Sequence, residues 1–171
     1  MSPDRRLRAG LTVLLLLVLA ACGLKPVYSG GSKSPAAVML TQVEIAPVPE
    51  RAGFLVRQAL IDRFGTPVAA PSYRLEIELD DQIVAFGVRG DNSAARERRT
   101  LRARYRLVDV ASNAVVLDAT AGADAGIDRV SSNYAVVAAE TTALDRLSVD
   151  IARQITARIA QFSRVAPDVP S

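Results

Sequence analysis

The sequence predicts an α+β fold: a roughly four-stranded, mainly antiparallel sheet with two amphipathic helices on one face, in the order β-α-β-β-β-α. Residues 73–80 and 100–108 alternate apolar and polar side chains, as half-buried strands do. Residues 50–64 and 133–162 repeat apolar side chains every three to four positions, as helices on a core do. Glycine, proline and asparagine lie between these stretches and favour turns.

The first two elements are a strand and a helix. A strand is predicted over Val38–Ile45, and it ends before Pro47 and Pro49, which cannot donate to a ladder. A helix is predicted over Glu50–Phe64, followed by Gly65 in the position that ends helices and by Pro67.

Three antiparallel strands are expected next. The first covers Tyr73–Asp80, and residues 83–88 beyond it are apolar on both faces. Either the strand continues and a partner protein covers its second face, or Asp81 begins a turn and a separate core strand follows. Residues 90–95 form a loop, and the later strands cover 100–108 and 114–120, joined by a turn at 112–113. Gly122 and Gly126 are expected to loosen the chain after the last strand.

A long helix closes the predicted domain. Ser131, Ser132 or Asn133 can cap its start, and its apolar stripe continues to Phe162. Both helices would bury their stripes against one face of the sheet, and the other face would meet water.

The N-terminus predicts export and lipid attachment. Arginines 5, 6 and 8 precede a short apolar run that ends in Leu19-Ala20-Ala21-Cys22, which resembles the lipobox of bacterial lipoproteins. The run is shorter than the roughly 20 residues that span a bilayer. We expect a signal peptide over 1–21, a lipidated N-terminus and linker over 22–36, one domain over 37–164 and a disordered tail over 165–171. Gly23 in place of an aspartate favours sorting to the outer membrane.

Composition argues against an enzyme. The chain has no histidine and a single cysteine, Cys22, so a histidine base, a free thiol nucleophile and a zinc site of those ligands are all missing. No catalytic residue, metal or cofactor is therefore assigned. The net charge of +3 falls to +1 when the signal peptide, with three arginines and one aspartate, is removed. We therefore expect no nucleic-acid partner.

Arginines form the densest charged feature. Arg102, Arg104 and Arg106 alternate with apolar residues and share one strand face, where Glu76 and Glu78 can stand opposite Arg102 and Arg104. These three can be ordinary cross-strand ion pairs or can bind anions. A ligand or partner contact is favoured for Arg96, Arg98 and Arg99, which have fewer obvious partners than the other three. The candidate ligand-binding residues are Arg89, Arg96, Arg98, Arg99, Arg102, Arg104 and Arg106.

Four segments together resemble the LptE family of lipopolysaccharide-assembly lipoproteins, over nearly the whole chain after residue 21. Val27, where the family often has leucine, is a mild departure. The segments are Cys22-Gly23-Leu24-Lys25-Pro26-Val27-Tyr28; the helix with Arg57 and Leu60; Tyr105-Arg106-Leu107 before a turn; and Ser132-Asn133-Tyr134-Ala135 before an alanine-rich helix with Ile155 and Arg158.

The resemblance implies an outer-membrane lipoprotein that faces the periplasm and the lumen of a large barrel, LptD. Family members plug this barrel, help it to fold and bind lipopolysaccharide in transit. Barrel lumens are polar, which suits a domain with a polar outer surface. The alternatives are an auxiliary lipoprotein of another, ABC-type lipid-transport system, and a lipoprotein hydrolase, for which no base is evident.

Cys22→Ala should release the protein from membranes, because the acyl chains on this residue would be its anchor. Cell fractionation followed by immunoblotting measures the release, and globomycin should make the unchanged protein accumulate in its unprocessed form. A Cys22→Ala protein that stays in the membrane fraction would contradict the lipid anchor.

Overall fold

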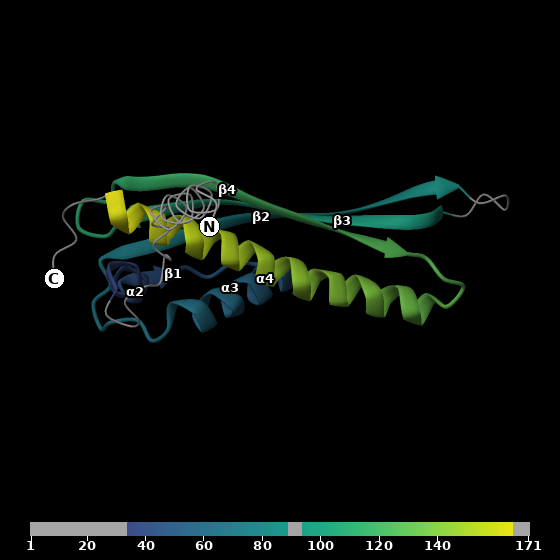
Figure 1. Ribbon diagram of the computed structural model, residues 1–171, viewed down its shortest axis with the longest axis horizontal. Coiled ribbons are helices and arrows are strands. Elements are labelled where there is room, and N and C mark those ends of the chain that lie inside the picture. Colours follow the sequence, from purple (N-terminus) through teal and green to yellow (C-terminus); the bar gives the residue numbers. More distant parts are fainter. Residues whose placement is uncertain (1–33, 89–93, 166–171) are drawn as a thin grey trace, which may run out of the picture.

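A computed structural model describes residues 34–88 and 94–165 as three helices and one four-stranded sheet (Figure 1). The elements follow the order α2 (Pro35–Thr41), β1 (Val43–Ile45), α3 (Glu50–Phe64), β2 (Tyr73–Val88), β3 (Ala94–Asp109), β4 (Val115–Asp128) and α4 (Asn133–Val165). The strands lie side by side in sequence order. β1 is parallel to β2, whereas β2, β3 and β4 are antiparallel. The predicted fold class is confirmed, with one more helix than expected.

The helices lie on one face of the sheet, which we call the inner face (Figure 1). α4 packs against α2, α3, β3 and β4, and α3 packs against β1 and β2. With 33 residues, α4 is a rod about 50 Å long. The core between the layers includes Leu75, Tyr105, Leu107, Ile151 and Ile155, each no more than 2% exposed. No helix of the described residues lies on the opposite, outer face.

The start of the domain differs from the prediction. A strand was expected over Val38–Ile45, but residues up to Thr41 form α2, and β1 is only three residues long. The side chain of Ser34 caps the helix by accepting a hydrogen bond from the Ala37 amide, and Pro35 occupies the first turn. Ala36, Met39 and Leu40 are buried at helical spacing. The residues from 34 to 36, assigned to the linker, therefore belong to a folded element.

The long strands settle two further expectations. β2 continues through Asp81 to Val88, so the alternative with a turn at Asp81 is wrong. β4 continues through Gly122 and Gly126 to Asp128, because β3 pairs with it along this whole length. The two glycines therefore do not loosen the chain.

The two predicted helices are confirmed. α3 begins and ends as predicted, and Gly65 follows it with a φ of 78° that favours glycine. Within α3, a Cβ on Gly53 would lie 2.7 Å from the Val48 carbonyl oxygen, so this close approach needs glycine. α4 begins at Asn133 and extends three residues beyond Phe162, to Val165. The signal peptide, Cys22, Arg89 and residues 166–171 of the tail lie outside the described residues.

Candidate functional site

The outer face of the sheet carries the cationic side chains of β3. Residues along β3 alternate between the two faces, and Leu101, Ala103 and Tyr105 are buried on the inner face. The even-numbered positions therefore point outward, and their exposed or half-exposed side chains include Arg96, Arg98, Arg102, Arg104 and Arg106. The predicted outward direction of Arg102, Arg104 and Arg106 is confirmed.

Two of the central arginines, Arg104 and Arg106, are held by carboxylates from neighbouring strands. A guanidinium nitrogen of Arg104 lies 2.9 Å from an Asp118 oxygen on β4, and this hydrogen bond raises the pKa of Arg104 and lowers that of Asp118. Arg106 lies 3.2 Å from Glu78 and 3.6 Å from Glu76. These pairs are exposed, so solvent screens them and they add little to stability.

The cross-strand register differs from the expected one. Glu78 stands opposite Arg104 as expected, but Glu76 stands opposite Arg106 rather than Arg104 or Arg102. The partner of Arg102 in the register is Asp80. Asp80 accepts two hydrogen bonds from the Gln82 side chain, each 3.1 Å long.

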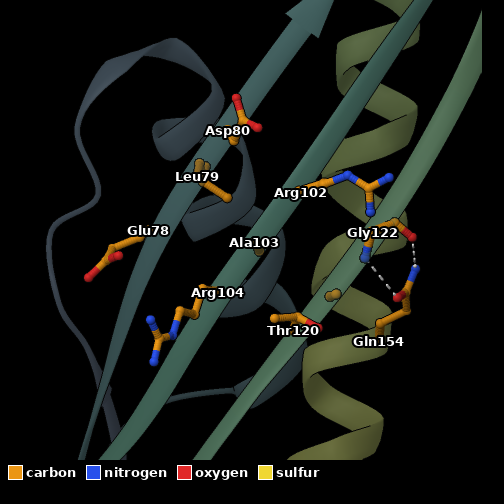
Figure 2. A pocket seen from close by; sticks show the side chains of 10 residues that line it. Glu78, Leu79, Asp80, Arg102, Ala103, Arg104, Thr120, Gly122 and Gln154 are labelled. Atoms are coloured by element: carbon orange, nitrogen blue, oxygen red, sulfur yellow. Dashed lines mark hydrogen bonds between the residues drawn. The ribbon is translucent and has the colours of Figure 1, made fainter.

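Arg102 borders a pocket of about 470 Å³ on the outer face (Figure 2). Its side chain extends across β4 at Gly122, where a Cβ would lie 3.4 Å from a guanidinium nitrogen, so the glycine leaves room for it. Gln154 of α4 reaches the same place and forms hydrogen bonds of 3.3 and 3.0 Å with the Gly122 amide and carbonyl. Within the described part of the chain, no ion pair involves Arg102. The pocket therefore offers a cation to an anionic group.

Arg98 and Arg96 lie further along the same face. The Arg98 guanidinium lies over the Phe86 ring, 5.6 Å from its centroid, which is a cation–π contact. Arg96 lies 3.1 Å from Asp128, and both side chains are mostly exposed. No carboxylate of the described residues pairs with Arg98, so Arg98 and Arg102 are the most available cations of this face.

Arg99 lies on the other face. Its Nε donates to Asp81 at 2.8 Å, and it also donates to the Glu140 carbonyl oxygen at 2.8 Å. Only 12% of its side chain is exposed, and the hydrogen bond to Asp81 raises its pKa. Arg99 therefore joins β2, β3 and α4, and the structure does not bring it together with the outward arginines.

A second polar cluster on the inner face was not expected from the sequence. Glu97 is 5% exposed and lies 2.9 Å from Arg129, while its Oε2 atom is buried without a hydrogen-bond partner among the described residues. Burial, and next the neighbouring Glu97 carboxyl group, raise the pKa of Glu140. Glu97 and the buried Leu101 are both odd-numbered positions of β3 and therefore point to the same face. This alternation could have revealed the cluster from the sequence.

The described residues contain neither a group of three or more potential metal ligands nor a helix long and apolar enough to cross a bilayer. The arrangement offers cationic and apolar surfaces for binding.

The fold is that of small α+β lipoproteins. The crystal structure of a lipoprotein from Caulobacter crescentus CB15 is similar, with a TM-score of 0.63 and 25% identity over 75% of this chain and 96% of that chain. Lipoprotein B of Nitrosomonas europaea shares the fold, with a TM-score of 0.57 and 16% identity over 71% of this chain and 83% of that chain. A minor lipoprotein of Acinetobacter baumannii also shares it, with a TM-score of 0.53 and 15% identity over 70% and 88%.

The family follows from the sequence match. The model of the LptE family, described as lipopolysaccharide-assembly, matches residues 40–159. The chain therefore belongs to the LptE family, which confirms the resemblance seen in its motifs. No curated protein matches the chain.

Glu140→Gln should raise the free energy of unfolding at pH 7 and change it little near pH 3. The folded state raises the pKa of Glu140, so wild-type stability falls as the pH rises through that pKa. The neutral amide removes this cost. Urea unfolding followed by circular dichroism at both pH values measures the effect, with Glu44→Gln on the exposed side of β1 as the control. A loss of stability at pH 7 would contradict the prediction.

Proposed function

We propose that this protein is an outer-membrane lipoprotein that binds lipopolysaccharide through the outer face of its sheet. Membership of the lipopolysaccharide-assembly family supports the general role. The observation that carries the specific proposal is the pair of available cations on this face, Arg98 and Arg102. Lipopolysaccharide carries phosphates and acidic sugars, and the guanidinium fork suits phosphate oxygens.

The distance between the two arginines suits a ligand with several anionic groups. Four positions along β3 separate them, or about 13 Å at strand spacing. The pocket beside Arg102 also contains Thr120 and Gln154, which can form hydrogen bonds with sugar or phosphate oxygens. Phe86 below Arg98 adds an apolar surface. Such a face can bind a large anionic amphiphile at more than one point.

The second part of the proposal is that the domain plugs the LptD barrel and assists its assembly. The described chain begins beside α2, at the end of the molecule opposite the β2–β3 hairpin (Figure 1). Ser34 lies twelve positions after Cys22 in the sequence, and this length of chain can span at most about 40 Å. A lipid anchor on Cys22 would keep the α2 end near the membrane. A polar, charged outer face suits the polar lumen of a barrel.

Arg102→Glu should lower the affinity for lipopolysaccharide about tenfold or more, because a charge-assisted hydrogen bond contributes roughly 1.5–3 kcal/mol. Arg98→Glu should have a similar effect, and the double variant a larger one. Fluorescence anisotropy with labelled lipopolysaccharide measures the affinity. Arg153→Glu, an equal charge change on an exposed position of α4, is the control and should bind nearly as well as wild type. Equal binding by all variants would exclude this face as the site.

Photo-crosslinking amino acids at Phe86, Arg98 and Arg104 should trap the LptD barrel in cells, because these side chains are exposed on the sheet. The product should have the mass of the two proteins together and react with antibodies to both. Capture of inner-membrane partners alone would instead support an auxiliary role in another lipid-transport system.

A further inference from the structure

The inner face of the sheet contains a buried carboxylate with one unsatisfied oxygen. Glu97 of β3 is 5% exposed, and its Oε1 atom lies 2.9 Å from a guanidinium nitrogen of Arg129. Its Oε2 atom is buried and has no hydrogen-bond partner in the described part of the chain. A buried oxygen without a donor has lost its water and gained nothing in return, which destabilises the fold. A hydrogen-bond donor for this oxygen is therefore to be sought among its neighbours.

A second acid, on α4, faces this carboxylate. The side chain of Glu140 lies within hydrogen-bond distance of the Glu97 carboxyl group. Two ionised carboxylates cannot form a hydrogen bond, because both only accept, whereas a protonated carboxyl group donates through its O–H. One proton on Glu140 would therefore supply the donor that the Glu97 Oε2 atom lacks.

The charges of the surrounding groups balance when one proton is bound. Three carboxylates and two guanidinium groups come together here, so the fully ionised cluster has one negative charge in excess. Its members are Asp81, Glu97, Glu140, Arg99 and Arg129. Asp145 also acts on Arg99, but it is exposed and solvent screens it. An unbalanced charge away from water is unfavourable, and a proton removes it.

The electrostatics of Glu140 agree with this balance. Burial, followed by the neighbouring Glu97 carboxyl group, raises the pKa of Glu140. Arg99 and Arg129 act in the opposite direction, and they offset only part of this rise in the pKa. The carboxyl group of Glu140 therefore keeps its proton to a higher pH than an exposed glutamate does.

We propose that Glu97 and Glu140 form a proton-binding site, in which the Glu140 carboxyl group donates to the Glu97 Oε2 atom and attaches the start of α4 to β3. Arg99 joins the same turn of the helix to the sheet, since it donates to the Glu140 carbonyl oxygen at 2.8 Å. Little else holds this part of the helix, because Val136 is the only buried residue between positions 133 and 142. Beyond it, buried Ala143 and Leu144 begin a nearly continuous apolar contact.

The attachment depends on pH. The folded state binds this proton more tightly than the unfolded chain does, because folding raises the pKa of Glu140. The hydrogen bond is therefore complete at low pH and is lost as the pH rises through that pKa. Above it, the two carboxylates repel each other between β3 and α4. The first two turns of α4 should then separate from the sheet more often, while the rest of the helix stays in place.

Hydrogen–deuterium exchange measures this opening. The full-length protein in detergent, with EDTA to exclude metal ions, is compared at pH 5 and pH 8, and each rate is divided by the intrinsic rate at that pH. Amides of residues 136–140 should exchange severalfold faster at the higher pH, and those of residues 151–159 should not change. Glu140→Gln should remove the acceleration, because its amide donates to the Glu97 Oε2 atom at both pH values. Glu44→Gln, on the exposed side of β1, is the matched control and should behave as wild type.

Carbon-13 NMR of the glutamate carboxyl groups detects the proton itself. One signal should titrate at a higher pH than all the others. It should be absent in Glu140→Gln and should titrate at a lower pH in Glu97→Gln, which removes the neighbouring charge. Titration of Glu140 together with the exposed glutamates, or an equal acceleration of exchange in wild type and Glu140→Gln, would overturn the proposal. Lipopolysaccharide binding through Arg98 and Arg102 is tested separately and does not depend on the outcome.

Discussion

The alternation of β3 is the constraint on which the rest of this structure depends. β3 is a central strand that pairs with β2 on one side and β4 on the other along almost its entire length. Its register is therefore fixed from both sides. Leu101, Ala103, Tyr105 and Leu107 are at most 2% exposed. A shift of one residue would bury the arginines between them and expose this core. The cationic outer face is thus a direct consequence of forming the hydrophobic core.

α4 adapts to this sheet along its length. The four alanines of β4 at positions 119, 121, 123 and 125 are on the face that packs against the core, and their small side chains leave room for the helix. Toward the hairpin, buried Ile127 and Val136 are accompanied by the ion pairs of Arg99 with Asp81 and of Glu97 with Arg129. Charged pairs that lose solvent contribute less than apolar packing does.

The sequence predicted best where a pattern had one physical meaning. The stripe of α3, followed by Gly65 and Pro67, was sufficient to place the helix at its correct ends. α2 was missed because β-branched Val38 and Val43 resembled a strand, while the capping Ser34 and Pro35 resembled a linker. The end of β4 was missed because alanine and glycine have low strand propensity, and the pairing with β3 outweighs it.

The sequence predicted an arginine-rich surface but not which arginines share one face of the sheet. Charge density placed Arg98 and Arg99 together, although neighbouring residues on a strand face opposite ways. Arg99 and Leu101 are both odd-numbered positions of β3, so both side chains point to the inner face. There Asp81 binds Arg99. The exact register of β3 with β4 could not be read from the sequence, because the irregularity at Leu107 and Val108 and the turn before β4 influence it.

The outer face contains two kinds of arginine, and the difference arises from how its acidic residues are used. Arg104 and Arg106 have carboxylates from β4 and β2 within ion-pair distance, which partly neutralise their charge. Asp80 could have paired with Arg102 across the strands, but Gln82 donates to both of its oxygens. Arg102 turns instead toward Gly122, where the missing side chain gives it room. The charge that the sheet does not neutralise is the charge that a ligand can use.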